Sequence, residues 1–363
     1  MNKAYKFRLY PNKEQKELIA KTFGCCRFVY NKMLGEKIDY YKETGTSLKV
    51  TPANYKAEYE WLKEVDSLAL ANEQWNLETA YKNFFRDQST GFPKFKSKKN
   101  DKKSYTTNCV NHNIRLEEGR IRLPKLGKIN IKQHRSIPTN YVLKSCTISQ
   151  AASGKYYGSV LFEYDETIMP AEVKTIIGLD FSMSELYISS EGESANYPRY
   201  YRCSLEKLKS MQRKLSKMER FSNNYYKQKR KIAILHEHIA NQRKDFLHKQ
   251  SRQIANANDL VGIEDLNMKA MQKALNFGKS VSDNAWGMFV SFLKYKLTER
   301  GKHLVKIDKW FPSSKTCSVC GVVKETLSLT ERVYICDCGN VVDRDINAAI
   351  NIKHEAMRTF ALV

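Results

Sequence analysis

The chain has 363 residues, 42% of them apolar, and this length and composition predict two or three packed units and exclude a disordered protein. Sixty-two Lys and Arg residues stand against thirty-nine Asp and Glu, giving a formal charge of +23. No apolar run approaches the length needed to cross a membrane, and residues 1–10 lack the features of a secretory signal, so we expect an intracellular, cytoplasmic protein.

The positive charge predicts a polyanionic partner, because self-repulsion disfavours compact folding unless something offsets it. Nucleic acid is the favoured partner, since each phosphate that a protein neutralises releases counterions along the strand. Two alternatives stay open from composition alone: surplus lysine that keeps the protein soluble, and attraction to an anionic membrane.

The amino-terminal half alternates between strand-like and helical patterns. Residues 1–10 predict a short strand that ends in a turn at Pro11, and one or two helices follow from Asn12, the expected N-cap. A second helical block covers residues 54–87. Residues 89–103 join a Gly/Pro turn to dense positive charge, which fits either a loop on a phosphate backbone or a solvated linker. Short strands over residues 104–165 predict a small β-barrel that the helical block splits in sequence.

In the carboxy-terminal half, an apolar strand over residues 173–179 ends in Asp180, and residues 186–189 return as its hairpin partner. Two long helices follow, and residues 204–252 hold fourteen Lys or Arg against four acids. This cationic hairpin is suited to lie along nucleic acid, with a solvated helix face as the alternative. We further expect strands over residues 260–264 and 303–307, a helix over residues 286–300 stopped by Gly301, and a final helix from Asp345.

Four of the nine cysteines lie within twenty-two residues and predict a metal site. Cys317 and Cys320 form one knuckle, and Cys336 and Cys338 follow after fifteen intervening residues, so four thiolates suit a structural, tetrahedral Zn²⁺ with no open position for water. The single residue between the second pair departs from the usual spacing and is expected to strain that knuckle. The other five cysteines are interpreted as small buried hydrophobes: Cys25, Cys26, Cys109, Cys146 and Cys203.

Three acidic residues stand at the ends of rigid elements, because Asp180 and Glu264 each close an apolar strand and Asp345 opens the final helix. Converging carboxylates would bind Mg²⁺ or Mn²⁺, and phosphodiester cleavage commonly uses two such ions. Taken singly, each residue is explained equally well by capping a helix or pairing with lysine. Their separation in the sequence leaves convergence open.

Several neighbouring residues are candidates for supporting roles. Asp343 and Arg344 are close enough in sequence to the last carboxylate to support it, with helix capping as an equal alternative for Asp343. Asn347 is a candidate to orient a ligand or contact a phosphate. His248 and Arg243, on the cationic helix, are candidates to touch a nucleic-acid strand, with a structural role as the alternative.

The motifs GLDFSMSELYISSEG, GIEDLNM, WFPSSKTCSVCG and CGNVVDRDINAAINI occur in the order seen in the TnpB family, transposon-encoded RNA-guided nucleases related to type V CRISPR effectors. YKFRLYPNKEQ, GCCRFVYN, QWNLETAYKNFF and GFPKFKSK resemble that family's amino-terminal half, so the resemblance covers nearly the whole chain. It implies a multidomain α/β plus β-barrel fold: a ribonuclease-H-like RuvC domain with an inserted zinc ribbon, and a wedge β-barrel interrupted by a helical recognition domain.

The resemblance also implies boundaries and roles. The wedge barrel would comprise residues 1–10 and 104–172, the recognition domain 11–103, the RuvC domain 173–310 and 341–363, and the ribbon 311–340. Asp180, Glu264 and Asp345 would be the RuvC carboxylates, with Asp345 preferred over Asp343 because it directly precedes INAA. Two departures, GLDFS in place of a glycine-containing turn and the shortened second knuckle, remove neither a carboxylate nor a thiolate.

By the same resemblance, the protein would bind a guide RNA as a monomer and cleave target double-stranded DNA, with a short flanking motif read by protein, near the prokaryotic nucleoid and with no membrane partner. One alternative is a nuclease-inactive or host-adopted relative that acts as a repressor or a defence effector. Its usual signature is loss of one carboxylate, and all three are present. A transposase that joins DNA ends is disfavoured, since strand transfer in such elements belongs to a separate protein.

Overall fold

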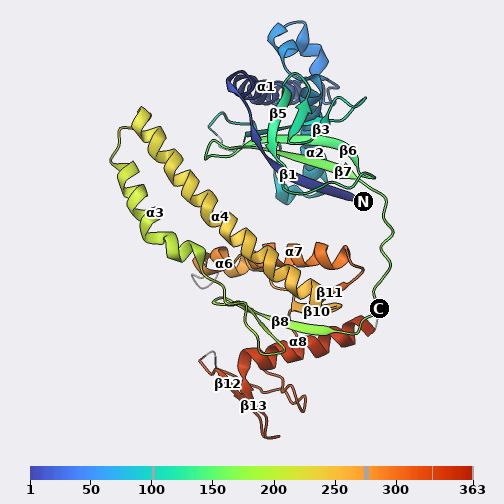
Figure 1. The fold of residues 1–363 in the computed structure, drawn as a ribbon, viewed down its shortest axis with the longest axis vertical. Helices are drawn as coiled ribbons and strands as arrows, with labels where there is room; N and C mark the ends of the chain where they lie inside the picture. Colours follow the sequence, from blue (N-terminus) through green and yellow to red (C-terminus); the bar gives the residue numbers. More distant parts are fainter. Residues whose placement is uncertain (100–102, 274–277, 329, 362–363) are drawn as a thin grey trace. The chain divides into compact units, whose positions relative to one another are not determined.

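The computed structural model describes residues 1–99, 103–273, 278–328 and 330–361. The chain divides into two compact units, Met1–Glu166 and Thr167–Val363 (Figure 1). Each unit has its own apolar core. Among the described residues, no helix combines the length and the apolar character needed to span a membrane.

The first unit is an antiparallel sheet packed with two α-helices. Its helical elements are α1 (Lys13–Thr44), α2 (Ser67–Arg86) and the short 3₁₀ turns η1 (Pro52–Lys56), η2 (Glu60–Glu64) and η3 (Gln88–Thr90). Its strands are β1 (Asn2–Tyr10), β2 (Lys103–Asn108), β3 (Arg115–Glu117), β4 (Arg120–Leu123), β5 (Gly127–Lys132), β6 (Val142–Gln150) and β7 (Tyr156–Glu163). They form one sheet in the order β2-β6-β7-β1-β5-β4-β3.

Helix α1 begins as the sequence predicts. The Asn12 side chain accepts a hydrogen bond from the Gln15 backbone at 2.8 Å, and the Gln15 side chain accepts one from the Asn12 backbone at 3.0 Å, which forms a capping box. One continuous helix then runs to Thr44, whereas the sequence alone left open whether this segment forms one helix or two. Gly45 ends it in the left-handed conformation, at φ 68°.

The predicted β-barrel is wrong, because the seven-stranded sheet is open. Its edge strands β2 and β3 do not pair with each other within the described residues. Helices α1 and α2 pack against β2 instead, where Phe23 meets Tyr105 edge to face and Asp66 accepts a hydrogen bond from Thr107. A helix-covered edge needs no barrel closure. The helical block does split the sheet in sequence as predicted, since β1 precedes it and pairs with β5 and β7.

The segment after η3 is fastened to both helices of the first unit. The Asn31 side chain makes two hydrogen bonds to the Lys96 backbone, donating to its carbonyl at 3.0 Å and accepting from its N–H at 2.7 Å. The Lys96 ammonium pairs with buried Glu73 and lies 4.2 Å from the centre of the Tyr30 ring. Residues 100–102 of the predicted phosphate-contacting loop lie outside the described residues.

The second unit holds a four-stranded sheet in the order β11-β10-β8-β9, with β8, β10 and β11 parallel and β9 antiparallel to β8. Its strands are β8 (Ile176–Ser182), β9 (Leu186–Ser189), β10 (Leu260–Glu264) and β11 (His303–Ile307), with β12 (Val333–Ile335) and β13 (Val341–Asp343) in a separate ribbon. Its helices are α3 (Tyr200–Ser216), α4 (Asn223–Ala257), α5 (Met268–Lys273), α6 (Gly278–Asn284), α7 (Trp286–Thr298) and α8 (Arg344–Ala361).

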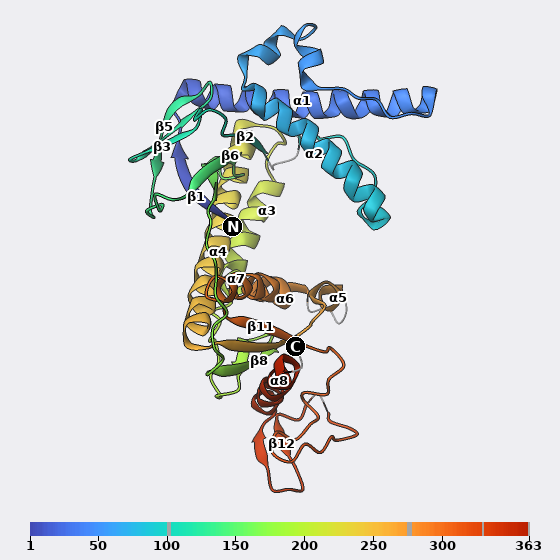
Figure 2. The same ribbon diagram turned by 90° about the vertical axis from the view of Figure 1, so that its right-hand side faces the viewer.

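Helices cover both faces of this sheet, as Figure 2 shows. On one face, Val261 and Ile263 of β10 join a core with α4 and α7. On the other, Leu260 packs with Ile352 and Ala356 of α8. The strand segments, hairpin, long helices and final helix predicted for this half are confirmed, and Gly301, at φ 67°, follows α7 as the predicted stop.

Two glycines allow α8 to lie close against the sheet. Gly178 of β8 and Gly262 of β10 are direct partners in the parallel register. A Cβ atom on Gly178 would come 2.1 Å from the Ala349 carbonyl oxygen, and one on Gly262 would come 2.6 Å from the Ala356 Cβ. Only hydrogen atoms fit between these strands and the helix. The close approach matters because each glycine lies two residues before a candidate carboxylate.

Candidate functional sites: a cysteine ribbon, an acidic cluster and cationic surfaces

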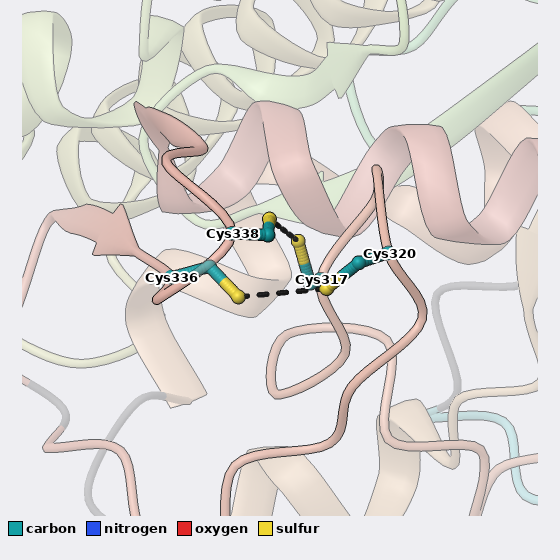
Figure 3. Close-up of side chains that lie close together, drawn as sticks. All are labelled: Cys317, Cys320, Cys336 and Cys338. Carbon is teal, nitrogen blue, oxygen red and sulfur yellow. Dashed lines mark hydrogen bonds between the residues drawn. The ribbon is translucent and has the colours of Figure 1, made fainter.

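The four predicted zinc ligands come together in one cluster. The Sγ atoms of Cys317 and Cys338, and those of Cys320 and Cys336, lie 3.6 Å apart, and all four sulfurs are within 4.8 Å of one another (Figure 3). Tetrahedral Zn–S bonds of about 2.3 Å place sulfurs about 3.8 Å apart, whereas a disulfide holds them at about 2 Å. The spacing therefore fits four thiolates around zinc and not disulfides.

The short second knuckle forms a turn like that of the first. In the first, the Gly321 N–H donates to the Cys317 carbonyl at 3.0 Å. In the second, the Gly339 N–H donates to the Cys336 carbonyl at 2.9 Å, and both glycines have positive φ, 76° and 90°. One residue fewer therefore still directs Cys338 toward the cluster, through a tighter turn whose glycine takes up the backbone geometry.

The first cysteine of the cluster is prepared to ionise. Burial raises the pKa of the Cys317 thiol, but hydrogen bonds from the backbone of Cys320 and Val319 and from the Asn340 side chain lower it to about 6. Zinc binds thiolate and displaces the proton. The hydrogen-bond donors around Cys317 therefore favour its thiolate, the form that binds zinc.

The parallel register places two of the three candidate carboxylates side by side. Leu179 pairs with Ile263, so Asp180 and Glu264 are the next residues on neighbouring strands. Strand alternation puts both on the same face as Gly178 and Gly262, the face that α8 covers. Asp345 lies in the first turn of α8.

The pKa of Asp180 reflects its burial and the charges of its neighbours. Burial raises the pKa of this carboxyl well above its usual value, and the charges of Glu264 and Asp345 raise it further. The three side chains thus share one electrostatic environment. Their oxygens are not gathered as the sulfurs are, because within the described residues the cysteines form the only group of three or more acidic, His or Cys side chains close enough to hold a metal ion.

Asp343 caps helix α8, the alternative that the sequence left open. Its Oδ1 accepts hydrogen bonds from the backbone N–H of Asp345 at 2.8 Å and of Ile346 at 3.2 Å. The Asp345 carboxylate has a different setting, with Arg332 at 3.9 Å. Arg344 donates to the Ser328 carbonyl at 2.9 Å and so ties the helix start to the ribbon.

Asp180, Glu264 and Asp345 form the acidic cluster, and sequence reasoning missed two residues beside it, Ser313 and Asn351. The Ser313 hydroxyl donates a hydrogen bond to Glu264, and the Asn351 side chain donates to the Ser313 carbonyl at 2.8 Å. Asn347, predicted to orient a ligand or touch phosphate, is fully buried. Its side chain donates a hydrogen bond to the Thr316 carbonyl and accepts one from the Ser318 N–H. The available signal was the i, i+4 pair of asparagines on a helix that otherwise buries apolar residues.

His248 and Arg243 have structural contacts on α4. The His248 ring stacks on Phe292 with centroids 3.9 Å apart, and its carbonyl accepts a hydrogen bond from buried Lys296 at 2.6 Å. Arg243 donates to the Ser282 carbonyl at 2.7 Å. These contacts fasten α4 to α7 and to the end of α6, which favours the structural alternative.

The outward face of the sheet in the first unit is cationic. Lys6 and Arg8 of β1 lie over the Tyr157 ring at 4.6 and 5.3 Å, and Arg8 pairs in register with Lys132. Further exposed cations continue across β4 and β5: Arg120, Arg122 and Lys128. Basic side chains interleaved with a tyrosine form a surface suited to phosphates and to a stacked base.

The predicted cationic hairpin of the second unit is present as α3 and α4. The two helices pack together, and Gln228 of α4 donates to the Met211 carbonyl of α3 at 3.0 Å. Helix α3 buries a single residue, Leu208. Most of its basic side chains are therefore exposed.

Comparison with known families matches most of the chain. A family model described as "Helix-turn-helix domain" matches residues 1–46, one described as "Probable transposase" matches residues 159–275, and one described as "Cas12f1-like, TNB domain" matches residues 286–352, which include the ribbon. In the structure, residues 1–46 form one strand and one continuous helix.

Relatives match over nearly the full chain. A Streptomyces pristinaespiralis protein named "Putative RNA-guided DNA endonuclease" is 36% identical, with 97% of this chain and 89% of the relative covered. The Escherichia coli protein "Putative RNA-guided DNA endonuclease InsQ" is 31% identical, with 96% and 91% covered. A chain in the structure titled "Cryo-EM structure of the Cas12f1-sgRNA-target DNA complex" aligns with a TM-score of 0.63 at 12% identity, covering 97% of this chain and 98% of that one.

The fold, with its cysteine ribbon, is therefore a Cas12f1-like multidomain α/β fold. The full-length relatives and the matched models place the protein more narrowly: the chain belongs to the TnpB family.

Proposed function

We propose that the protein is a transposon-encoded, RNA-guided DNA endonuclease whose RuvC-type site comprises Asp180, Glu264 and Asp345. The observation that carries the proposal is the parallel register, in which Asp180 and Glu264 each follow the Leu179–Ile263 pair on neighbouring strands. Asp345 lies close enough to raise the pKa of Asp180. Full-length similarity to proteins named as RNA-guided DNA endonucleases supports the same activity. The parallel strands with a helix on each face are consistent with a ribonuclease-H-like domain.

The donor set of the acidic cluster fits a hard divalent cation. Three carboxylates on rigid elements offer oxygen ligands. Burial, together with the charges of Glu264 and Asp345, raises the pKa of Asp180, and a bound cation would offset this cost of ionisation. Bound Mg²⁺ or Mn²⁺ would supply an activated water and stabilise the leaving oxygen during phosphodiester cleavage. Asp180 and Glu264 would bind from the sheet and Asp345 from α8.

The ribbon would hold Zn²⁺ as a structural ion. All four donors are thiols, so no position remains for a reacting water. Its turn is fastened to α8, the helix that also carries Asp345, through Asn347. The zinc would therefore fix the ribbon beside the acidic cluster and take no part in the chemistry.

Guide RNA and target DNA are the partners that the cationic surfaces suit. The sheet face of the first unit combines Lys6, Arg8 and Tyr157, and the α3–α4 hairpin offers a second exposed cationic surface. Neutralised phosphates would give salt-dependent affinity, and base pairing with the guide would supply most of the sequence specificity.

The proposal is tested with protein purified together with its co-expressed RNA, followed by RNA sequencing and incubation with a target library. We expect Mg²⁺-dependent cleavage by the parent protein and none by Asp180→Ala, which removes a ligand but no cationic surface. Target occupancy, measured by gel shift, should stay within about threefold of the parent. Cleavage by Asp180→Ala would refute the site, and occupancy without cleavage by the parent would indicate a nuclease-inactive binder.

A further inference from the structure

The Ser313 hydroxyl is held in place beside Glu264. Ser313 is 6% exposed, lies between β11 and the ribbon, and donates its hydroxyl hydrogen bond to Glu264 Oε1. Its own N–H donates to the Phe311 carbonyl at 2.8 Å, while the Pro312 carbonyl accepts from the Thr316 N–H at 3.0 Å. This tight turn fixes the serine backbone, so few hydroxyl positions are available.

Helix α8 fixes the same turn from the other side. Asn351 is 4% exposed, and its side-chain nitrogen donates both to the Ser313 carbonyl at 2.8 Å and to the Thr316 carbonyl at 2.6 Å. Asn347, one helical turn earlier, donates to the Thr316 carbonyl at 2.7 Å and accepts from the Ser318 N–H at 3.0 Å. The ribbon, α8 and Glu264 are thus joined by one buried series of hydrogen bonds.

We propose that Ser313 is a positioning residue that fixes one carboxylate oxygen of Glu264 and leaves the other available to a divalent cation, with Asn351 holding Ser313 in place. The inference rests on the proposed function, since it assigns Ser313 a role at that acidic cluster. A carboxylate with one oxygen hydrogen-bonded loses less rotamer freedom when it binds a cation. Hydrogen bonds of this kind to metal ligands typically change metal affinity by about 10–100-fold.

The test is direct Mn²⁺ binding to the protein–RNA complex, followed by electron paramagnetic resonance, with the Asp345→Ala complex giving the background from RNA and surface. We expect Ser313→Ala to weaken Mn²⁺ binding about tenfold or more. Ser313→Thr keeps a hydroxyl and should recover most of the affinity. Ser314→Ala, which changes the adjacent serine in the same turn, is the matched control and should bind Mn²⁺ as the parent does.

Asn351→Ala tests whether Asn351 affects Mn²⁺ binding only through Ser313, as a relay, or also independently of Ser313. If Asn351 acts on Glu264 through Ser313, its substitution weakens Mn²⁺ binding in the parent but adds nothing in the Ser313→Ala background. Zinc content and thermal melting of each variant show whether the ribbon and the fold are intact. An equal further loss of Mn²⁺ affinity in the double variant would overturn the relay.

Superposed Mn²⁺ binding curves for the parent and Ser313→Ala would overturn the Ser313 assignment, whatever the cleavage result. Cleavage by the parent answers the separate question of function. If Mn²⁺ binding by the parent depends on Ser313 but the parent cuts no target, the nuclease proposal is refuted and the positioning role stands. If the parent cuts its target and Ser313→Ala binds Mn²⁺ as the parent does, the nuclease proposal stands and the positioning role is refuted.

Discussion

The cysteine ribbon and the acidic cluster differ in how far the protein alone assembles them. The four sulfurs lie within 4.8 Å of one another, whereas the three carboxylates influence one another electrostatically without their oxygens gathering in the same way. The pKa values of Cys320 and Cys338 are raised, so these thiols can lie close to Cys317 with little charge repulsion, and local backbone turns build both knuckles. Ionised carboxylates repel one another, and the three carboxylates of the acidic cluster come from three separate elements, β8, β10 and α8. We therefore expect the ribbon to depend on local sequence and the acidic cluster on the packing of α8 against the sheet.

Substitution of the two acidic residues at the start of α8 should give the largest contrast. We expect Asp345→Ala to lower the cleavage rate by about a thousandfold or more, as loss of an essential group does. Asp343→Ala should cost about 1 kcal/mol of stability through the lost cap and retain most of the cleavage. Single-turnover cleavage and thermal melting of both variants measure this, and equal loss of cleavage would make Asp343 part of the cluster.

Gly178→Ala should damage the acidic cluster while leaving the ribbon intact. The added Cβ would meet the backbone of α8, which cannot move aside as a flexible side chain can. Overpacking of this kind costs about 1–3 kcal/mol, and the displaced helix should also lower cleavage. Gly287→Ala is the matched control, since its Cβ meets nothing within 4 Å in α7. Unchanged zinc content with reduced cleavage and a lower Tm is the expected result for Gly178→Ala.

Cys317→Ser should damage the ribbon first and affect the acidic cluster only as a consequence, the opposite of Gly178→Ala. We expect loss of zinc from the purified protein and a Tm lower by a few degrees, with weaker cleavage as a secondary effect through α8. Cys203→Ser is the control, because Cys203 lies outside the cluster and is exposed, so the prediction that it is buried was wrong. Full zinc content in Cys317→Ser would remove this residue from the ligand set.

Asp180→Asn should stabilise the metal-free protein slightly while it abolishes cleavage. The pKa of Asp180 is raised by burial and then by Glu264 and Asp345, so its ionised form destabilises the fold. That penalty is absent below the unfolded pKa, near 3.9, and grows as pH rises through the raised folded pKa. The Asn variant should therefore melt a few degrees higher than the parent at pH 7 without divalent ions, with the difference shrinking toward pH 4. A lower Tm at pH 7 would contradict this electrostatic account.

The sequence predictions that were confirmed depended on local features of the sequence. Asn12 before an amphipathic run, the apolar segments that end in Asp180 and Glu264, and the spacing from Cys317 to Cys338 each depend on a few adjacent residues. The barrel prediction failed because sheet closure depends on which edges meet, and α1 and α2 cover β2 instead. Ser313 was missed because its hydrogen bond to the Glu264 side chain joins residues far apart in the sequence and leaves no local pattern. For Asn351, the four-residue spacing from Asn347 was the available signal, but it does not reveal which backbone carbonyls accept the hydrogen bonds.

The double hydrogen bond between Asn31 and the Lys96 backbone gives the basic stretch that follows a fixed point of departure. Lys98 and Lys99 follow only two and three residues beyond this anchor, so the chain that carries them has little length over which to move away from it. A polyanion that meets them has less chain entropy to immobilise than it would on a free tail. In the RNA-guided nuclease proposed above, the amide of a single asparagine would thus hold part of a charged linker in place for phosphate.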